Sequence, residues 1–312
     1  MILMTKYKHF LITRFNIPFN PFDINKIRFL FDEKYLENRF NLFEKYCFSS
    51  VVNQTNQDFI WLVFFDIRTP DKFKTRNIEL KKKYNNYCPI YIDFNCIIKD
   101  RETSHKYIEE VKRLNLIYNG NINYDEKDNF FKLYIVKFIS DTIKKFSNDD
   151  EFIITTRLDN DDALHKRMIE FIQNIEISDD KLICLDNGLQ FIENTSICQS
   201  YYYPNNHFTS YIERNKSDLF TILFWEHYFI SKVKKVSHYN TEPLWLEILH
   251  SSNAANSVQF NDENKIKLRY SLLDFSINVS SNIFKSIASV TTNPKQYLIP
   301  LLKYYIKRIL PI

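Results

Sequence analysis

Three carboxylates lie within four residues of one short polar segment. Asp159, Asp161 and Asp162 follow the apolar run 152–154, and a helical pattern that starts at Met168 comes after them. Like charges at this spacing repel and raise one another's pKa unless a cation compensates them. Carboxylate oxygens are hard ligands that suit Mg²⁺ or Mn²⁺. The segment therefore predicts a divalent-metal site at the carboxyl end of a strand, where open α/β sheets bind ligands.

The same segment could instead be a helix cap or a calcium-binding loop. A bare D-x-D pattern is weak evidence, and an aspartate-rich loop can simply cap the next helix, with Asp161 or Asp162 at the N-cap. A calcium loop that starts at Asp159 would place Ala163 and Leu164 where a ligand and a glycine are needed. The sequence excludes the calcium loop and leaves the helix cap open.

The composition excludes several classes of protein. Apolar residues make up 45% of the 312 residues, enough for a sizeable core. The only glycines are Gly120 and Gly188, so there is no glycine-rich phosphate loop, and side chains with a metal must hold any nucleotide. A net charge of +4 is too balanced for a nucleic-acid partner. Five cysteines without a C-x-x-C pair indicate reduced thiols and a cytoplasmic protein.

The two ends of the chain bear on its relation to a membrane. Residues 1–15 lack a small-residue cleavage site, and no run of 18 apolar residues occurs, so neither a signal peptide nor a transmembrane helix is expected. Residues 294–312 form a candidate basic amphipathic helix, which favours an anionic leaflet. We therefore expect a cytoplasmic protein, peripheral at the inner face of the membrane. The alternative is that this helix packs on the core or on a second subunit.

The first half of the chain alternates between predicted strands and helices. Strands are predicted at 10–12, 59–65, 90–92 and 152–154, and helices at 34–53, 71–84, 103–117 and 129–147. Such alternation predicts a largely parallel sheet that is covered on both faces.

The second half has shorter predicted elements. Strands are predicted at 181–185, 188–192, 196–203 and 234–239, and a helix at 217–227. Residues 243–250 carry apolar side chains at helical spacing, which puts His250 at the end of a helical face. One α/β domain with a C-terminal extension fits this pattern better than two independent domains.

Five segments in chain order share the pattern of one family. They are residues 11–16, 39–44, 54–66 with Thr69-Pro70, 157–164 and 245–253. Together they resemble the putative rhamnosyltransferase family of glycosyltransferases, although Ser251 stands where that pattern has glycine. The resemblance implies a GT-A type fold: a mostly parallel sheet flanked by helices, with a C-terminal helical extension. It implies a nucleotide-sugar-binding half at 1–165, an acceptor-binding half of the same domain at 166–260, and the extension at 261–312.

The resemblance also implies an activity and a cofactor. It implies transfer of a sugar, rhamnose by the family name, from a nucleotide-sugar donor to a glycan or lipid-linked glycan in bacterial surface polysaccharide biosynthesis. Asp159 and Asp161 would hold Mn²⁺ or Mg²⁺ against the donor diphosphate. Asp162 would face the donor sugar or cap the next helix.

Other side chains at strand ends would contact the donor. These candidates are Thr13, Arg14, Asn16, Asp66 and Arg157. The planar fork of Arg157 suits phosphate or sugar hydroxyls. A surface ion pair is the alternative role for Arg157, and a turn position is the alternative for Asp66. Trp61 is expected in the core.

Histidines and carboxylates from the second half of the chain would complete the site. His250, with His238 as its rival, is a candidate metal ligand because neutral imidazole binds Mn²⁺ well. An inverting reaction needs a carboxylate that takes the proton of the acceptor hydroxyl, whereas a retaining reaction does not need it there. The candidate bases are Glu213, Glu226, Asp186 and Glu242, of which we place Glu213 first.

Two other functions stay open. A nucleotidyltransferase would use a similar sheet and metal, but it usually needs a glycine-rich loop after the first strand, and the chain has none there. A non-catalytic carbohydrate-binding or scaffold protein would use the aspartates only to cap a helix.

Overall fold

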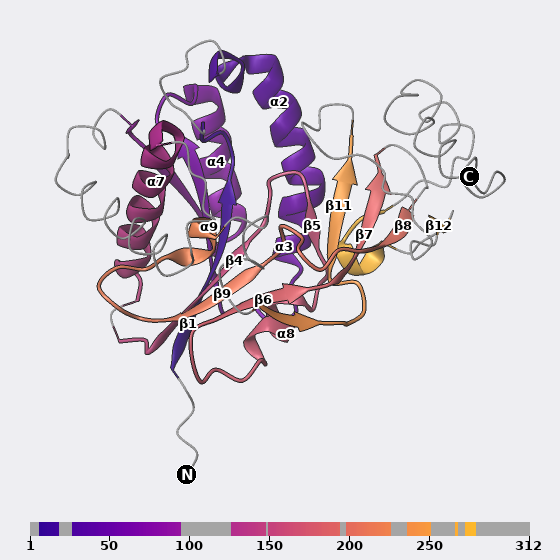
Figure 1. The fold of residues 1–312 in the computed structure, drawn as a ribbon. Coiled ribbons are helices and arrows are strands. Elements are labelled where there is room, and N and C mark those ends of the chain that lie inside the picture. The colour runs from indigo at the N-terminus through magenta and orange to yellow at the C-terminus, as the bar shows by residue number, and fades with distance from the viewer. Residues whose placement is uncertain are drawn as a thin grey trace.

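The computed structural model describes residues 6–18, 27–94, 126–147, 149–193, 198–225, 236–250, 266–267 and 272–278. These residues form two β-sheets with helices packed around the larger one (Figure 1). The predicted helices at 103–117 and 294–312 lie outside the described residues. Among the described helices, none is long and apolar enough to cross a membrane.

The larger sheet has seven strands in the order β10-β6-β9-β4-β1-β2-β3. Their bounds are β1 Tyr7–Arg14, β2 Ile60–Asp66, β3 Tyr87–Ile92, β4 Phe152–Arg157, β6 Lys181–Leu185, β9 Ser210–Arg214 and β10 Val236–Tyr239. The neighbours β4, β1, β2 and β3 are parallel, as are β6 and β10, whereas β9 is antiparallel to both β4 and β6. The predicted α/β class with a mostly parallel sheet is confirmed, and β9 was not predicted.

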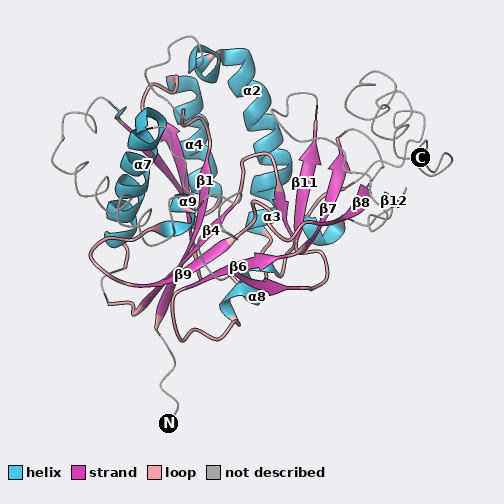
Figure 2. Ribbon diagram, in the orientation of Figure 1, coloured by secondary structure: helices cyan, strands magenta, loops and turns pink. Residues whose placement is uncertain are grey.

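Helices pack apolar side chains against both faces of this sheet (Figure 2). Alternate residues of each strand enter separate cores, with Leu11 and Trp61 in one and Ile12 and Leu62 in the other. Strands that are buried on both faces read as continuous apolar runs, which explains why β1 and β2 stand out in the sequence.

The helices match most of the predicted ones. They are α2 Glu33–Leu42, a π-helix at Phe43–Phe48, α3 Ser49–Val52, α4 Asp71–Lys83, α7 Glu126–Lys144, α8 Met168–Gln173 and α9 Thr221–Phe224. Asp32 begins α2 as its N-cap, where its side chain accepts a hydrogen bond from the backbone N–H of Tyr35 at 2.9 Å. Where a helix was predicted at 217–227, the described residues form only the short α9.

The smaller sheet has five strands in the order β12-β8-β7-β11-β5. They are β5 Ala163–Leu164, β7 Asn187–Ile192, β8 Cys198–Tyr202, β11 Trp245–Leu249 and β12 Ile266–Lys267. The prediction of a helical face at 243–250 is wrong. The segment contains β11, a strand that has neighbours on both sides and is buried at every residue. A short apolar run does not distinguish a buried strand from a helix by its spacing alone.

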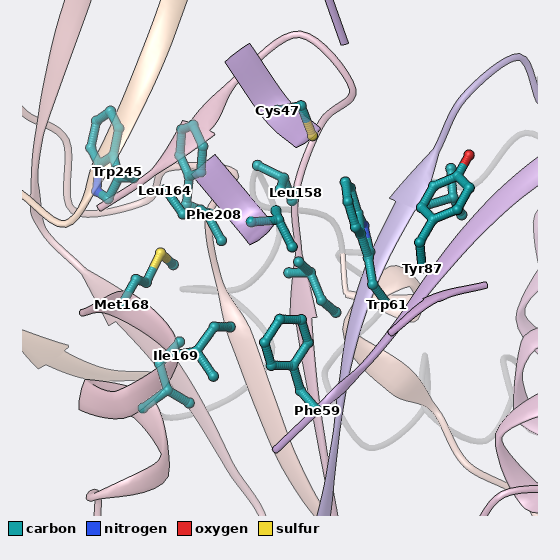
Figure 3. Packing of buried hydrophobic residues seen from close by; sticks show 14 of the residues in the cluster. Cys47, Phe59, Trp61, Tyr87, Leu158, Leu164, Met168, Ile169, Phe208 and Trp245 are labelled. Carbon is teal, nitrogen blue, oxygen red and sulfur yellow. The ribbon is translucent and has the colours of Figure 1, made fainter. Parts of the chain in front are cut away.

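Trp245 fastens the smaller sheet to the larger one. Its ring lies over Gly188 on β7, where an added Cβ would come within 2.1 Å of a ring atom, so only glycine fits. Its indole N–H donates to the carbonyl of Leu185 at the end of β6, at 2.7 Å. Phe208 stacks on the same ring at 4.8 Å. The two sheets consequently share one apolar core, in which Trp61 and Trp245 belong to the same cluster (Figure 3).

Candidate functional site

The three aspartates occupy the chain crossing between the two sheets. β4 ends at Arg157, and the backbone N–H of Leu158 still donates to Ile12 of β1 at 3.0 Å. After the aspartates, β5 pairs antiparallel with β11. The segment therefore lies at the carboxyl edge of the parallel strands, as predicted.

The helix-cap interpretation of the aspartates is wrong. The next helix, α8, begins at Met168. Its N-cap residue is Arg167, and no side chain caps it. The aspartates are thus too far along the chain to cap α8, and their carboxylates have other partners.

Asp161 is held by an arginine and a histidine from distant parts of the chain. Its Oδ2 accepts a hydrogen bond from Nη1 of Arg39 at 3.0 Å and lies 2.9 Å from Nε2 of His250. Burial alone would raise the pKa of Asp161, but Arg39 and His250 outweigh burial and lower it. The carboxylate of Asp161 is therefore charged although it is buried, and His250 contacts it directly.

Arg39 is a site residue that the sequence analysis did not single out by itself. Besides Asp161, its guanidinium donates to Oδ1 of Asn160. Asn160 in turn donates to the carbonyl of Phe15 at 2.8 Å, so α2, the end of β1 and the aspartate segment are tied together. A signal was present: Arg39 stands on the buried stripe of α2, three residues after Leu36, where an arginine needs a buried acid.

Asp162 and His207 form a second acid–base pair in the cluster. Nε2 of His207 lies 2.9 Å from Oδ2 of Asp162, and the other oxygen accepts the backbone N–H of Ile248 on β11 at 2.9 Å. Burial, followed by the charges of Asp161 and Glu247, raises the pKa of Asp162 to about 7 against the opposing effect of His207. Burial lowers the pKa of His207, but the acidic neighbours, with Asp162 first, raise it overall to about 8.

Asp159 is the most accessible of the three aspartates. Its side chain is 33% exposed and forms a two-bonded fork with Arg157, at 3.1 and 3.0 Å. Burial would raise its pKa, but the charges of Arg157, His207 and Arg14 lower it. Arg157 and Arg14 thus bring positive charge to the same edge of the sheet. The ion pair of Arg157 was one of its two expected roles.

The ligand groups are arranged differently from the expected set of Asp159, Asp161 and His250. One oxygen of Asp159, one oxygen of Asp162 and one nitrogen of His207 lie within 4.8 Å of one another. The structure therefore groups Asp159 with Asp162 and His207, and pairs Asp161 with His250 beside them. No pattern in the sequence pointed to His207, which lies in the loop before β9.

This donor set fits a divalent cation. Two carboxylate oxygens and one imidazole nitrogen are ligands that Mn²⁺ accepts readily, and the carboxylates also suit Mg²⁺. Asp159 provides the exposed side of the group.

Glu247 adds a fourth carboxylate that the sequence analysis passed over. It lies on β11, is 5% exposed, and accepts a hydrogen bond from the amide of Gln190 on β7. Burial raises its pKa, His207 and the Gln190 amide lower it, and Asp161 and Asp159 raise it further. Glu247 therefore lies close enough to the aspartates to interact with them.

The expected donor contacts at the first two strands have partners inside the protein. Thr13 is buried and accepts from the indole N–H of Trp61 at 3.0 Å, which also confirms Trp61 as a core residue. Asn16 donates to Thr69 at 3.0 Å and accepts from the backbone N–H of Asp66 at 3.2 Å. The Asp66 carboxylate, fully buried, is held by the guanidinium of Arg68 at 2.7 and 2.9 Å. These contacts support a turn role for Asp66.

The structure does not bring Glu213 to the aspartates. It pairs with Ile153 near the start of β4, the strand end opposite the cluster. Its carboxylate accepts the backbone N–H groups of Phe220 and Thr221 at 2.9 and 2.8 Å, next to α9.

The other expected side chains lie at different places. Asp186 pairs with His238 at 2.8 Å, so this rival histidine belongs to a separate cluster. Glu242 pairs with Arg167 at 3.3 Å on the surface. Glu226 lies outside the described residues.

Comparison with known proteins gives one finding. No curated protein matches the chain. A family described as putative rhamnosyl transferase matches residues 8–142, from β1 to the end of α7, which stops short of the aspartates. Its name suggests a glycosyltransferase. The match supports, over residues 8–142, the resemblance to putative rhamnosyltransferases that the sequence motifs indicated.

Proposed function

We propose that the chain is a metal-dependent glycosyltransferase of GT-A type. It takes a nucleotide-sugar donor and a glycan or lipid-linked glycan acceptor, and Asp159, Asp162 and His207 hold Mn²⁺ or Mg²⁺. The observation that carries the proposal is the convergence of these three ligand groups within 4.8 Å at the carboxyl edge of a mostly parallel sheet. The family match to residues 8–142 supports the reaction class.

The side chains of the site have separate tasks in this proposal. A bound cation stabilises the charge that develops on the departing nucleoside diphosphate. The backbone N–H of Ile248 fixes one oxygen of Asp162, which leaves the other to face the cation site. Arg157 orients Asp159 through a fork that contacts both of its carboxylate oxygens.

Around these ligands, a second set of side chains supplies charge. Arg39 and His250 keep Asp161 charged, so the cluster retains the negative potential that attracts a divalent ion. Arg14 and Arg157 supply positive charge beside Asp159, where the phosphates of a donor would lie.

Glu247 takes the role of general base that the sequence analysis gave to Glu213. It is a buried carboxylate on the acceptor side of the cluster, and Gln190 orients it through an amide hydrogen bond. A raised pKa suits a group that accepts a proton near neutral pH. Glu247→Gln should lower kcat and leave the KM for the donor nearly unchanged, whereas Glu213→Gln should act through stability.

A thermal-shift experiment with matched variants tests the proposed metal and donor. UDP, dTDP, GDP and CMP are each added with and without Mn²⁺ or Mg²⁺. A nucleotide at one hundred times its dissociation constant stabilises the fold by about 2.7 kcal/mol. We expect this stabilisation to require the metal and to disappear in Asp159→Asn. Asp71→Asn, a change at an exposed side chain of α4, is the control.

The products separate the rival functions. A glycosyltransferase releases a nucleoside diphosphate from a nucleotide-sugar, whereas a nucleotidyltransferase releases pyrophosphate from a nucleoside triphosphate. A scaffold protein releases neither. Metal-dependent stabilisation that persists unchanged in Asp159→Asn would overturn the assignment of the metal site.

A further inference from the structure

A second cluster of metal-ligating side chains lies at the outer edge of the larger sheet. Cys184 on β6 stands directly opposite His238 on the edge strand β10, and Asp186 follows two residues after Cys184. One ligand atom of each lies within 4.8 Å of the other two, and Nδ1 of His238 is 2.8 Å from Oδ1 of Asp186. None of the three takes part in the proposed transfer reaction.

The backbone around this cluster is fixed on several sides. The N–H of Asp186 donates to the carbonyl of Tyr239 at 3.1 Å, which joins the ends of β6 and β10. The buried amide of Asn206 donates to Sγ of Cys184 at 3.3 Å and to the carbonyl of Leu185 at 2.8 Å. An amide donor to sulfur is the kind of outer contact that orients a thiolate ligand. The site is therefore already shaped before any ion enters.

The cluster combines buried ligands with one accessible side. Cys184 and Asp186 are buried, whereas the side chain of His238 is 39% exposed. A cation from solvent can thus reach the group past His238, and water can fill a remaining coordination position.

A nucleophilic cysteine is the other chemistry that these residue types suggest, and the geometry speaks against it. In a nucleophilic pair the histidine contacts the thiol, but the hydrogen bond of His238 goes to Asp186. Burial and the charge of Asp186 raise the pKa of Cys184 to about 12, whereas reactive thiols have a lowered pKa.

We propose that Cys184, Asp186 and His238 form a Zn²⁺ site that clips the edge strand β10 to β6. One sulfur, one nitrogen and one oxygen are the ligands that zinc combines in proteins, at about 2.0–2.3 Å, with a fourth position for water. Zinc displaces the thiol proton to solvent when it binds. Among the described residues, the other candidate group consists of Asp159, Asp162 and His207 and offers oxygen and nitrogen ligands, so the two sites favour different metals.

Cobalt titration of the full chain tests this site separately from the proposed active site. Co²⁺ bound to a thiolate gives a charge-transfer band in the near ultraviolet, and Co²⁺ at Asp159, Asp162 and His207 cannot give one. We expect the wild-type protein to develop this band, Zn²⁺ to abolish it, and Cys184→Ser and His238→Ala to lose it. Cys88→Ser, at a free cysteine of β3, should keep it.

Two further measurements keep the outcomes distinct. His238→Ala changes an exposed side chain, so its fold should survive, and it should weaken Zn²⁺ binding at least about tenfold in a competition titration. Asp159→Asn should keep the thiolate band even though it loses metal-dependent nucleotide binding. A folded wild-type protein without the band, or a band that persists in folded Cys184→Ser, would overturn the zinc site and leave the proposed transfer function untouched.

Discussion

Two strands of the larger sheet lead to a buried carboxylate, at the last residue of β2 and just after β4, and the partners of the two carboxylates come from different distances along the chain. After β2, Asp66 is held by Arg68, which is two residues away. After β4, Asp161 is held by Arg39 and His250, which are 122 and 89 residues away. We call these the β2 turn (66–70) and the β4 segment (158–162).

The difference shows when carboxylates at the end of a strand can form a binding site. The β2 turn satisfies its one carboxylate locally, and Thr69 closes the turn on the carbonyl of Asp66 at 2.6 Å. The β4 segment draws on α2, β11 and the loop before β9, and the charge of Asp161 still raises the pKa of Asp162. When distant partners reduce the repulsion between carboxylates without removing it, negative charge remains that a ligand such as a cation can bind.

The largest contrast should come from removing the arginine at each end. Arg39→Met leaves Asp161 buried with His250 alone, and a buried ion that loses a partner costs about 3–5 kcal/mol. Arg68→Met leaves Asp66 its backbone partner, so the loss should be about 1.5–3 kcal/mol. Urea unfolding of both variants measures the difference. Equal losses would mean that distant partners matter no more than local ones.

The same aspartate-to-asparagine change should affect activity at only one end. Asp162→Asn should lower kcat by roughly 10²–10³-fold, because a charge that stabilises the reacting groups is lost. Asp66→Asn should change activity less than its loss of stability suggests, because Asp66 is fully committed to Arg68. Steady-state transfer assays at saturating metal compare them. An inactive but well-folded Asp66→Asn would return Asp66 to the donor site.

Each end also has a buried asparagine that joins separate parts of the chain. Asn16 links β1 to the β2 turn, and Asn160 links Phe15 to Arg39. Replacing either by alanine should cost about 1–3 kcal/mol, because buried polar partners lose their hydrogen bonds. Only Asn160→Ala should also reduce activity, by roughly 10–100-fold, since it orients Arg39. Parallel assays of both variants at a temperature well below their melting points check this.

The smallest effect is a pH dependence that the β4 segment should have through His207. The pKa of His207 is raised to about 8 from 6.5, so its stabilisation is complete below pH 6.5 and is lost as pH rises through about 8. The raised pKa of Asp162, about 7, acts in the same direction at lower pH. The melting temperature of the metal-free protein should therefore fall by a few degrees from about pH 6 to about pH 9.

His207→Gln is the control for this pH effect. The amide can still donate to Asp162, but it does not titrate, so the fall above pH 6.5 should become shallower. An identical melting curve in wild type and His207→Gln across this range would assign the pH dependence to other groups.

The sequence predicted those parts of the fold whose signal is local. The strands β1, β2 and β4 are apolar runs buried on both faces, and α2 and α4 have a clear apolar stripe. β9 was missed because its buried residues include Glu213, whose partners are backbone N–H groups. A buried glutamate looks like surface in a sequence.

The sequence predicted where the aspartates of the candidate site lie, but not which side chains contact them. The positions of Asp159, Asp161 and Asp162 follow from strand ends. Which side chains neutralise them depends on how α2, β11 and the loop before β9 converge, and no local spacing contains that information. His207 is the clearest case, since nothing in its own segment distinguishes it.

The contact between Gly188 and Trp245 restricts how this protein can change over generations. A side chain at position 188 has no space while the indole lies there, and the indole in turn holds the two sheets together through Leu185. Neither position can drift by itself. A lineage that gains alanine at 188 must first have a smaller residue at 245, and it must find another way to join its sheets. We therefore expect the two residues to be inherited together, although they are 57 residues apart in the sequence. They face each other in the pairing of β7 with β11, two residues before the pair Gln190 and Glu247.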